Sequence, residues 1–172
     1  YSISQSDNMV TLQRELDNVK NYFSIQQYRF GDRFQLEFHI DEDTLNLVLP
    51  KITLQPVVEN AICHGLEPKI AGGKINISSY RTKNRLIVKV SDDGIGMSRE
   101  TLNRIRENLS GRNLVQKKSG EKGTGIAIAN VHNRLKLFFG NHFGLDIQSA
   151  PQMGTDVELI LPIVTAQKIQ HH

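Results

Sequence analysis

Apolar residues repeat with a helical period near the start of the chain. Between residues 10 and 30 they stand three, four or seven positions apart, and polar residues fill the opposite side. The repeat consists of Leu12, Leu16, Val19, Phe23 and Phe30. This spacing predicts an amphipathic helix. Gly31 and Asp32 follow the repeat and mark the end of the helix.

Strand patterns follow in five places. Residues 33–40 alternate apolar and polar side chains, which predicts a strand with one face in the core. Residues 74–81 and 85–92 are strand-like runs joined by a short polar turn, so they predict a hairpin. Residues 143–149 and 155–162 predict two last strands, which a second turn connects.

Helical patterns lie between these strands. Residues 41–50 are interpreted as a turn and a short helical piece that Pro50 closes. Residues 51–66 have a helical period with Pro56 inside it. Because proline has no N–H to donate, Pro56 either opens the helix at its first turn or kinks it.

Two more helices flank an aperiodic run. Residues 98–109 predict a helix with Ser98 as its N-terminal cap. Residues 125–139 predict a helix that is opened by glycines and ended by Gly140. The run between these helices, residues 110–124, is rich in glycine, lysine and serine and is interpreted as a mobile loop.

The order of these elements favours one fold class. It reads strand, helix, hairpin, helix, helix, hairpin. Most neighbouring strands are joined by short turns, so the sheet should be mixed and mainly antiparallel. The helices would then cover one face of the sheet. The expected fold class is therefore α+β, built as a two-layer sandwich.

The composition narrows the possible classes of function. Of the 172 residues, 38% are hydrophobic and 23% are charged, which is typical of one globular domain or of one domain with an appended arm. The net charge of +3 is too small and too scattered to indicate nucleic-acid binding. The single cysteine, Cys63, excludes an internal disulfide, and no apolar run is long enough to span a bilayer.

The first stretch with candidate chemistry is "ENAICHG", residues 59–65. Asn60 and His64 stand four apart and so project from the same side of a helix, while Glu59 lies about 100° round from Asn60. A buried amide or carboxylate without a partner costs about 1–3 kcal/mol, so side chains, water or a hydrated cation must satisfy these groups. Their oxygens suit Mg²⁺, which keeps several waters and shares its other ligands with phosphate.

The second stretch is "SDDGIGM", residues 91–97. An aspartate at a strand end followed by alternating glycines lets the backbone approach a flat ligand closely. The Asp92 carboxylate could accept a hydrogen bond from an exocyclic amine such as that of adenine. An ordinary Asx turn is the alternative explanation of such a short pattern.

The third stretch is "EKGTGIAIAN", residues 121–130. Gly123 and Gly125 precede a helix, so free amides and the positive end of the helix face whatever lies in front of them. This arrangement predicts a phosphate site, although a plain glycine-rich helix start is the alternative. The lysine-rich run before it is either a solvated loop or a segment that meets a polyanion such as a triphosphate.

Taken together, the three stretches resemble a known family. "LQPVVENAICHG", "DDGIGM" and "GTGIAIANV", in this order and spacing, are similar to the N box and the two glycine boxes of the GHKL ATPase superfamily, which includes gyrase, the ninety-kilodalton heat-shock chaperone, histidine kinases and MutL. The closest likeness is to LytS/YesM-type histidine kinases. It rests on the first motif and on "LQRELDNVKNYFSIQQYRFGDRF", which resembles the segment that links the phosphoacceptor region to the ATPase domain. "GTDVELILP" resembles the closing strand.

The resemblance implies a Bergerat-type ATPase fold and a role for each matching residue. Asn60 would bind Mg²⁺ that bridges the phosphates, and Glu59 would be the polar or general-base residue near the γ-phosphate. Asp92 would receive the adenine amine. Gly94 and Gly96 would let the base lie close.

The remaining implied contacts come from the helix start, the lid and the last strand. Gly123, Thr124 and Gly125 would contact phosphates through their backbone amides. Residues 98–122 would form an ATP lid, in which Lys118 or Lys122 would touch phosphate. The other nucleotide-binding positions implied are His64, at the N-box histidine position, and Thr155, which would support the base. Ala127 departs from the family pattern, since many kinases have a glycine there.

The resemblance also implies domain limits. Residues 1–31 would be a linker helix towards an acceptor region outside this sequence, and residues 32–164 the catalytic domain. Residues 165–172 would be a tail, whose terminal pair His171 and His172 is read as a tag remnant.

The implied function is that of a protein-histidine kinase in a two-component system. The γ-phosphate of ATP would pass to an acceptor histidine outside this chain and then to an aspartate of a response regulator. The full-length protein is expected to be a membrane-anchored homodimer, with this part in the cytoplasm and without a nucleic-acid partner. Two alternatives stay open: a GHKL nucleotide-binding sensor module without kinase activity, and another GHKL ATPase or serine kinase.

Overall fold

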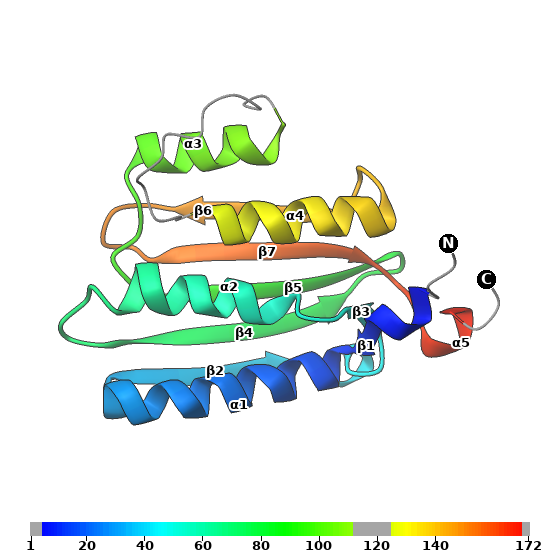
Figure 1. Ribbon diagram of the computed structural model, residues 1–172, viewed down its shortest axis with the longest axis horizontal. Coiled ribbons are helices and arrows are strands. Elements are labelled where there is room, and N and C mark those ends of the chain that lie inside the picture. Colours follow the sequence, from blue (N-terminus) through cyan, green and yellow to red (C-terminus); the bar gives the residue numbers. More distant parts are fainter. Residues whose placement is uncertain (1–4, 112–124, 170–172) are drawn as a thin grey trace.

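Five strands form one mixed sheet in the computed structural model, which describes residues 5–111 and 125–169 (Figure 1). They stand in the order β2, β4, β5, β7, β6. Their bounds are β2 Phe34–Ile40, β4 Gly73–Arg81, β5 Arg85–Asp92, β6 Gly144–Ser149 and β7 Thr155–Pro162. β2 and β4 run parallel, and the other neighbouring pairs of this sheet run antiparallel. The prediction of a mixed, mainly antiparallel sheet is confirmed.

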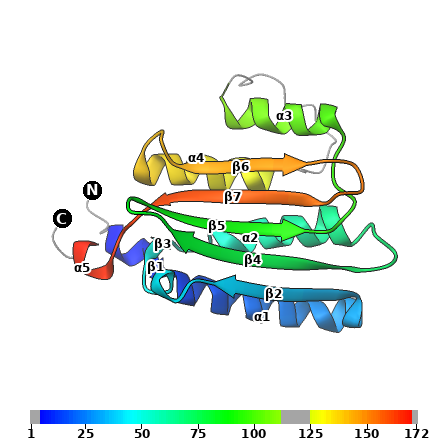
Figure 2. The same ribbon diagram turned by 180° about the vertical axis from the view of Figure 1, so that it is seen from behind.

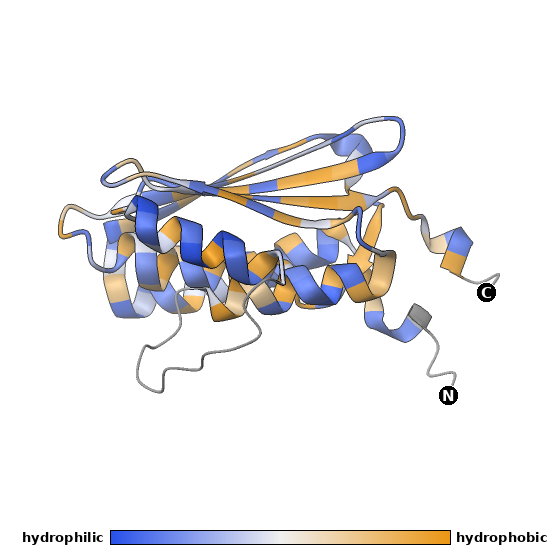
Figure 3. Cartoon of the chain, turned by 90° about the horizontal axis from the view of Figure 1, so that it is seen from above, coloured by the Kyte–Doolittle hydropathy of each residue, from blue (hydrophilic) through white to orange (hydrophobic). Residues whose placement is uncertain are grey.

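Helices cover one face of this sheet (Figures 2 and 3). α1 (Leu12–Phe30), α2 (Leu54–Asn60) and α4 (Ile126–Phe139) lie over it, and α3 (Arg99–Leu109) packs against α4 and β6. α2 continues directly into η4 (Ala61–Leu66), a wide π-helical turn. The two-layer α+β sandwich expected from the sequence is therefore confirmed.

Local sequence explains where the helices begin and end. Thr11 caps α1 by accepting a hydrogen bond from the Arg14 N–H at 3.2 Å, and Ser98 caps α3 by accepting from the Thr101 N–H at 3.1 Å. Pro56 stands in the first turn of α2, where its missing N–H leaves no helical bond unmade. Of the two predicted outcomes for Pro56, the first is the one observed.

A second, small sheet corrects one sequence expectation. Residues 41–50 hold a single short helical turn, η3 (Glu42–Thr44), but β3 (Val48–Pro50) pairs antiparallel with β1 (Met9–Thr11). These three-residue strands have no internal period, and their partners lie far apart in the sequence. The chain also forms short turns η1 (Gln5–Asn8) and η2 (Gly31–Arg33) and a last helical turn, α5 (Ala166–Ile169).

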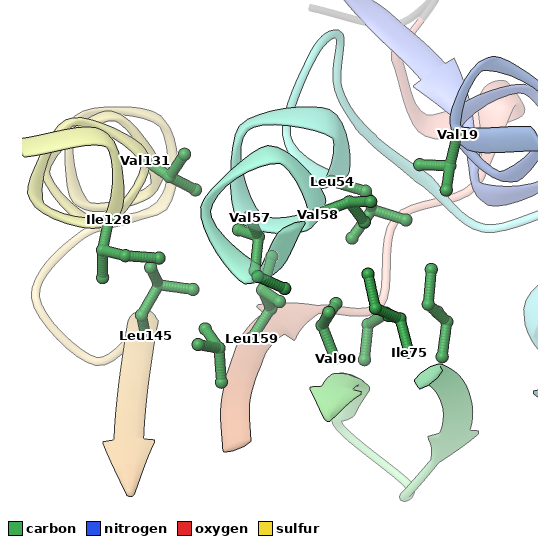
Figure 4. Packing of buried hydrophobic residues seen from close by; sticks show 14 of the residues in the cluster. Val19, Leu54, Val57, Val58, Ile75, Val90, Ile128, Val131, Leu145 and Leu159 are labelled. Carbon is green, nitrogen blue, oxygen red and sulfur yellow. The ribbon is translucent and has the colours of Figure 1, made fainter. Parts of the chain in front are cut away.

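The core lies between the helices and the sheet (Figure 4). α1 contributes Val19, α2 contributes Val57 and Val58, and the sheet contributes residues such as Ile75 and Leu159. α1 thus shares its core with the rest of the fold, while the expected domain limits at residues 31 and 164 stay predictions. Within residues 5–111 and 125–169, no helix combines the length and the apolar character needed to cross a bilayer.

Candidate functional site

A cleft of about 300 Å³ opens between the end of α2, η4, the end of β5 and the start of α3. Antiparallel pairing sets Asp92, the last residue of β5, opposite Thr155, the first residue of β7. Three segments that are distant in the sequence therefore meet at this end of the sheet. The lining residues are Asn60, His64, Gly65, Pro68, Asp92, Ile95, Gly96, Met97, Ser98, Thr101 and Thr155.

Asp92 is the acidic group of the cleft. Its side chain is buried, and its Oδ1 accepts a hydrogen bond from the Gly94 N–H at 2.9 Å. Burial raises the pKa of Asp92 from 3.8 to about 6, against the lowering effect of the Gly94 and Thr155 backbone hydrogen bonds, and Asp93 and Asp156 raise it further. The carboxylate is thus mainly ionised at neutral pH. It can accept further hydrogen bonds from a ligand in the cleft.

Asn60 is the buried amide of the cleft. Only 7% of its surface is exposed, and its Oδ1 has no hydrogen-bond partner within the part of the chain that the structure describes. A buried polar atom in this state carries a cost of about 1–3 kcal/mol that a ligand would remove. His64, half-buried, lines the same cleft, as its spacing from Asn60 predicted.

Glycine lets two backbone segments meet beside Asp92. A Cβ atom at Gly65 would lie 2.5 Å from the Asp92 Oδ1, and one at Gly94 would lie 2.3 Å from the Gly65 carbonyl carbon. The Ile95 N–H also donates to the Gly65 carbonyl at 3.0 Å. Any larger residue at Gly65 would displace the carboxylate. Gly94 therefore serves the contact with η4, while Gly96 lines the cleft itself.

Two hydroxyl groups connect the loop after β5 to the start of β7. The Ser149 hydroxyl donates to the Gly154 carbonyl at 2.8 Å and lies 3.0 Å from the Thr155 Oγ1. It also accepts from the Met97 N–H at 2.9 Å. Thr155 is itself buried. These bonds hold the wall of the cleft next to Asp92.

Glu59 lies apart from the cleft lining and makes its hydrogen bond within α2. Its Oε1 accepts a hydrogen bond from the Gln55 Nε2 at 3.0 Å. Its charge also acts on Tyr22 of α1. The pKa of Tyr22 is raised to about 12, mainly because the phenol is partly buried and secondarily because of the negative charge of Glu59. The predicted role of Glu59 near a γ-phosphate stays a prediction.

The second glycine box is described only in part. Lys118, Lys122, Gly123 and Thr124 lie outside the described residues, as does most of the expected lid. Gly125 precedes α4 with a φ of +124°, and a Cβ atom there would lie 3.1 Å from the Ile105 side chain of α3. Its predicted contact with phosphate stays a prediction.

Sequence reasoning missed part of the cleft wall. Gly65, Pro68, Ile95 and Met97 line it without having been assigned a role, and Thr101 had been assigned only as part of the expected lid. Each lies in or directly beside a stretch that had been singled out, so adjacency to the motifs was the available signal.

Comparison with known protein families gives matches along most of the chain. The family model described as "Histidine kinase-, DNA gyrase B-, and HSP90-like ATPase" matches residues 48–165. A second model, described as "Histidine kinase", matches residues 1–34.

Curated relatives match the chain over a part of their own length. The sensor histidine kinase YesM of Bacillus subtilis is 35% identical over 161 residues, which cover 94% of this chain and 25% of YesM. The sensor histidine kinase YpdA of Escherichia coli is 34% identical over 163 residues, or 94% of this chain and 26% of YpdA. The chain therefore spans about a quarter of the length of these relatives.

Solved structures share the fold. The catalytic domain of the histidine kinase ThkA superposes with a TM-score of 0.65 at 16% identity, covering 91% of this chain and 97% of that domain. The mycobacterial sensor histidine kinase MprB gives a TM-score of 0.59 at 13% identity, with coverage of 91% and 97%. At such identities the likeness concerns the fold alone.

Proposed function

The chain belongs to the histidine kinase-, DNA gyrase B- and HSP90-like ATPase family, and from this premise we propose that it is the ATP-binding catalytic domain of a two-component sensor histidine kinase. Membership of an ATPase family implies that the domain binds nucleotide. The proposed reaction is transfer of the γ-phosphoryl group of ATP to a histidine that lies outside these residues. The relatives that share 34–35% identity are named sensor histidine kinases, which supports this choice within the family.

The observation that carries the proposal is the pairing of Asn60 and Asp92 in one cleft. Asn60 offers a buried oxygen that has no hydrogen-bond partner among the described residues, and Asp92 offers a buried carboxylate with acceptor capacity left. An adenine nucleotide has a hydrogen-bond donor at one end, the exocyclic amine, and metal-bound phosphates at the other. The two groups would therefore hold its two ends.

The residues present fit a magnesium ion that is shared with phosphate. The described residues contain no cluster of three or more His, Cys, Asp or Glu side chains that could hold a metal by themselves. Mg²⁺ instead favours oxygen ligands, keeps several waters and takes substrate phosphates as ligands. Asn60 Oδ1 would be its protein ligand. Once bound, the ion would neutralise phosphate charge.

The protein's own groups would act chiefly by positioning, because phosphoryl transfer requires little covalent chemistry from the enzyme. Asp92 would orient the base, with Thr155 and Gly96 beside it. His64 would contact the nucleotide from η4, and Gly123, Thr124 and Gly125 would donate backbone amides to phosphate. Residues 98–122 would close over the nucleotide as a lid, with Lys118 or Lys122 on a phosphate.

Glu59 would act on the side from which the acceptor approaches. Its carboxylate lies outside the cleft lining and its charge acts on Tyr22 of α1, so a role as polar residue or base requires an acceptor histidine that approaches from outside the cleft. The acceptor Nε2 would form a bond to the γ-phosphorus as the bond to ADP breaks. A later transfer would place the phosphoryl group on a response-regulator aspartate. The whole protein would be a membrane-anchored homodimer with this domain in the cytoplasm.

A labelling experiment tests the proposed reaction. The chain is incubated with γ-labelled ATP, Mg²⁺ and a separate fragment of the full-length protein that carries the acceptor helix. Label on a histidine of the fragment is expected. Nucleotide binding without transfer would instead indicate the sensor module, and label on serine would indicate the serine-kinase alternative.

The metal site is tested by Asn60→Asp. The substitution changes the charge and geometry of the one proposed protein ligand, so the gain in ADP affinity that Mg²⁺ gives the parent should change. Calorimetry with Mg²⁺ and with a chelator measures this gain. An equal gain in the variant and in the parent would remove Asn60 from the metal site.

A further inference from the structure

A strained segment joins β3 to the helix that carries Asn60. Ile52 has a φ of +57°, a left-handed conformation that a β-branched residue rarely adopts. Its side chain is 57% exposed, so burial of the side chain does not account for this conformation. Contacts of the backbone must hold residues 51–53 in place.

Glu15 of α1 makes one set of these contacts. It is 2% exposed, and its Oε1 accepts from the Ile52 N–H at 2.7 Å. Its Oε2 accepts from the N–H groups of Thr53 and Leu54 at 2.9 and 3.0 Å. The first amides of a helix have no partners within that helix and need a cap. The Thr53 hydroxyl donates to the Pro50 carbonyl instead, so Glu15 from another helix is the cap of α2.

Arg134 of α4 holds the same segment from the other side. Its guanidinium donates to the carbonyl of Lys51, to the carbonyl of Ile52 at 3.3 Å and to the Thr53 Oγ1 at 3.4 Å. Amides of residues 52–54 thus meet a carboxylate, and carbonyls of residues 51–52 meet a cation. The segment is fixed between α1 and α4.

We propose that Glu15 is a positioning residue for the nucleotide site, with Arg134 as its counterpart, because together they fix the start of α2 and through it the place of Asn60. This inference rests on the proposed function, in which Asn60 is the protein ligand of Mg²⁺. Asn60 stands six residues after Leu54, about 9 Å along the helix axis at 1.5 Å per residue. A tilt of about 5° at the start of α2 would therefore move Asn60 by roughly 0.8 Å. Displacements of this size can cost a large factor in reactions that depend on positioning.

Glu15→Gln is the sharpest substitution, because it keeps the shape of the side chain. The amide oxygen can still accept from two of the three N–H groups. Its NH₂ group, however, then faces an N–H donor, and two donors cannot bond to each other. The start of α2 should shift or loosen while the core contacts of α1 persist.

The test separates binding of the base from binding that depends on the metal. The Kd for ADP is measured for the whole 172-residue chain with chelator and with Mg²⁺, in the parent and in Glu15→Gln. The Kd in chelator should change less than the Kd with Mg²⁺, because the substitution removes no direct contact of Asp92 or of its loop. The gain in affinity from Mg²⁺ should fall at least about fivefold, the lower end of typical coupling between sites.

Thr44→Val is the matched control. Thr44 is fully buried, and its hydroxyl donates to the Asp41 carbonyl at 2.6 Å and lies 2.6 Å from the Ser79 Oγ. The variant removes buried hydrogen bonds of similar cost at a site whose partners, Asp41 and Ser79, lie outside residues 51–54. Its Tm should fall as in Glu15→Gln, while its gain from Mg²⁺ stays that of the parent.

Arg134→Gln provides the second test and keeps the inference falsifiable if Glu15→Gln does not fold. It should also lower the gain from Mg²⁺, and the double variant should lose less than the sum of the two, because both residues hold one segment. If Mg²⁺ raises the ADP affinity of the parent and of the variants by the same factor, this inference alone is overturned. A parent that does not respond to Mg²⁺ would overturn the proposed metal site and this inference with it.

Discussion

The substitution Asp92→Asn should lower the affinity for nucleotide and at the same time raise the stability of the domain at pH 8. The two effects have one cause: the Asp92 carboxylate is buried in the cleft, where its charge destabilises the fold but can bind a ligand. The pKa of Asp92 is raised from 3.8 to about 6, chiefly by burial. Because the folded state then binds more protons than the unfolded state between these values, stability falls as the pH rises from about 4 to 6.

The magnitude follows from the size of this shift. One pKa unit corresponds to about 1.4 kcal/mol, so above pH 6 the ionised carboxylate costs the folded state on the order of 3 kcal/mol. An asparagine has nearly the same shape, and its oxygen can still accept from the Gly94 N–H. The variant should therefore gain up to about 3 kcal/mol at pH 8, which raises Tm by up to roughly 6–12 °C in a domain of this size. The gain should shrink as the pH falls from 6 to 4.

The loss of binding follows from the lost charge. A hydrogen bond to a charged acceptor contributes about 1.5–3 kcal/mol, so the affinity for ADP should fall roughly 10- to 100-fold. Calorimetric titration with ADP and thermal unfolding between pH 4 and 8 measure the two effects. Unchanged affinity would refute the role of Asp92 as base receptor, and a lower Tm at pH 8 would refute the argument from burial.

Asp93→Asn is the control for this experiment. Asp93 is the next residue, but it is exposed and lies apart from the cleft lining. Its Oδ1 accepts from the Lys74 N–H at 2.8 Å and lies 3.9 Å from the Lys69 Nζ. Its replacement should leave the affinity for ADP close to that of the parent.

Three further predictions concern the same cleft. Gly65→Ala should lower the affinity for ADP at least about tenfold by calorimetry, because the new Cβ atom would lie 2.5 Å from the Asp92 Oδ1 and push it aside. Thr155→Val should lower Tm by roughly 2–4 °C in thermal unfolding, because it removes the 3.0 Å contact with Ser149 at a net cost of about 1 kcal/mol. Adenosine has no phosphate to titrate, so its affinity reports on Asp92 alone. Below pH 6, where Asp92 becomes protonated, this affinity should decrease with falling pH, with a slope that approaches about tenfold per pH unit. Equal affinity for adenosine at pH 7 and pH 5 would contradict this prediction.

The sequence predicted the parts of the fold that have a period of their own. The long helix α1 and the β4–β5 hairpin were found because their apolar positions repeat over many residues. The sequence pattern predicts a short helical piece where β3 forms, because three residues show no period and the pairing partner lies almost 40 positions upstream. The pairing of β3 with β1 makes these residues a strand, and a local sequence pattern contains no information about such a distant partner.

The sequence motifs predicted several of the residues that line the cleft. They did not predict the residues that hold these lining residues in place. The motifs that contain Asn60, Asp92 and Thr155 do meet in one cleft, which the order of these motifs suggested. The predicted site did not include Glu15, which stands three residues after Leu12 and four before Val19 and so lies on the apolar stripe of α1. A carboxylate on a buried stripe needs partners, and this was the signal that could have revealed the cap.

The wide turn η4 explains how one short segment supplies three lining residues. In a regular α-helix Asn60 and Gly65 would point about 140° apart, so both could not face the cleft. A π-helical turn bonds each N–H to the carbonyl five residues earlier, as the Glu67 N–H does to the Ile62 carbonyl at 2.8 Å, and brings residue i+5 closer in direction to residue i than an α-helix does.

The core does not require this turn. Ile62 and Leu66 are buried and stand four apart, a spacing that an ordinary α-helix would bury equally well. What the wide turn adds is that the amide of Asn60 and the bare Cα of Gly65 face the same space, one towards the proposed metal and the other against the Asp92 carboxylate. We infer that the rare helix geometry serves the proposed nucleotide site and not the packing of the core, in keeping with the frequent occurrence of such turns at functional sites.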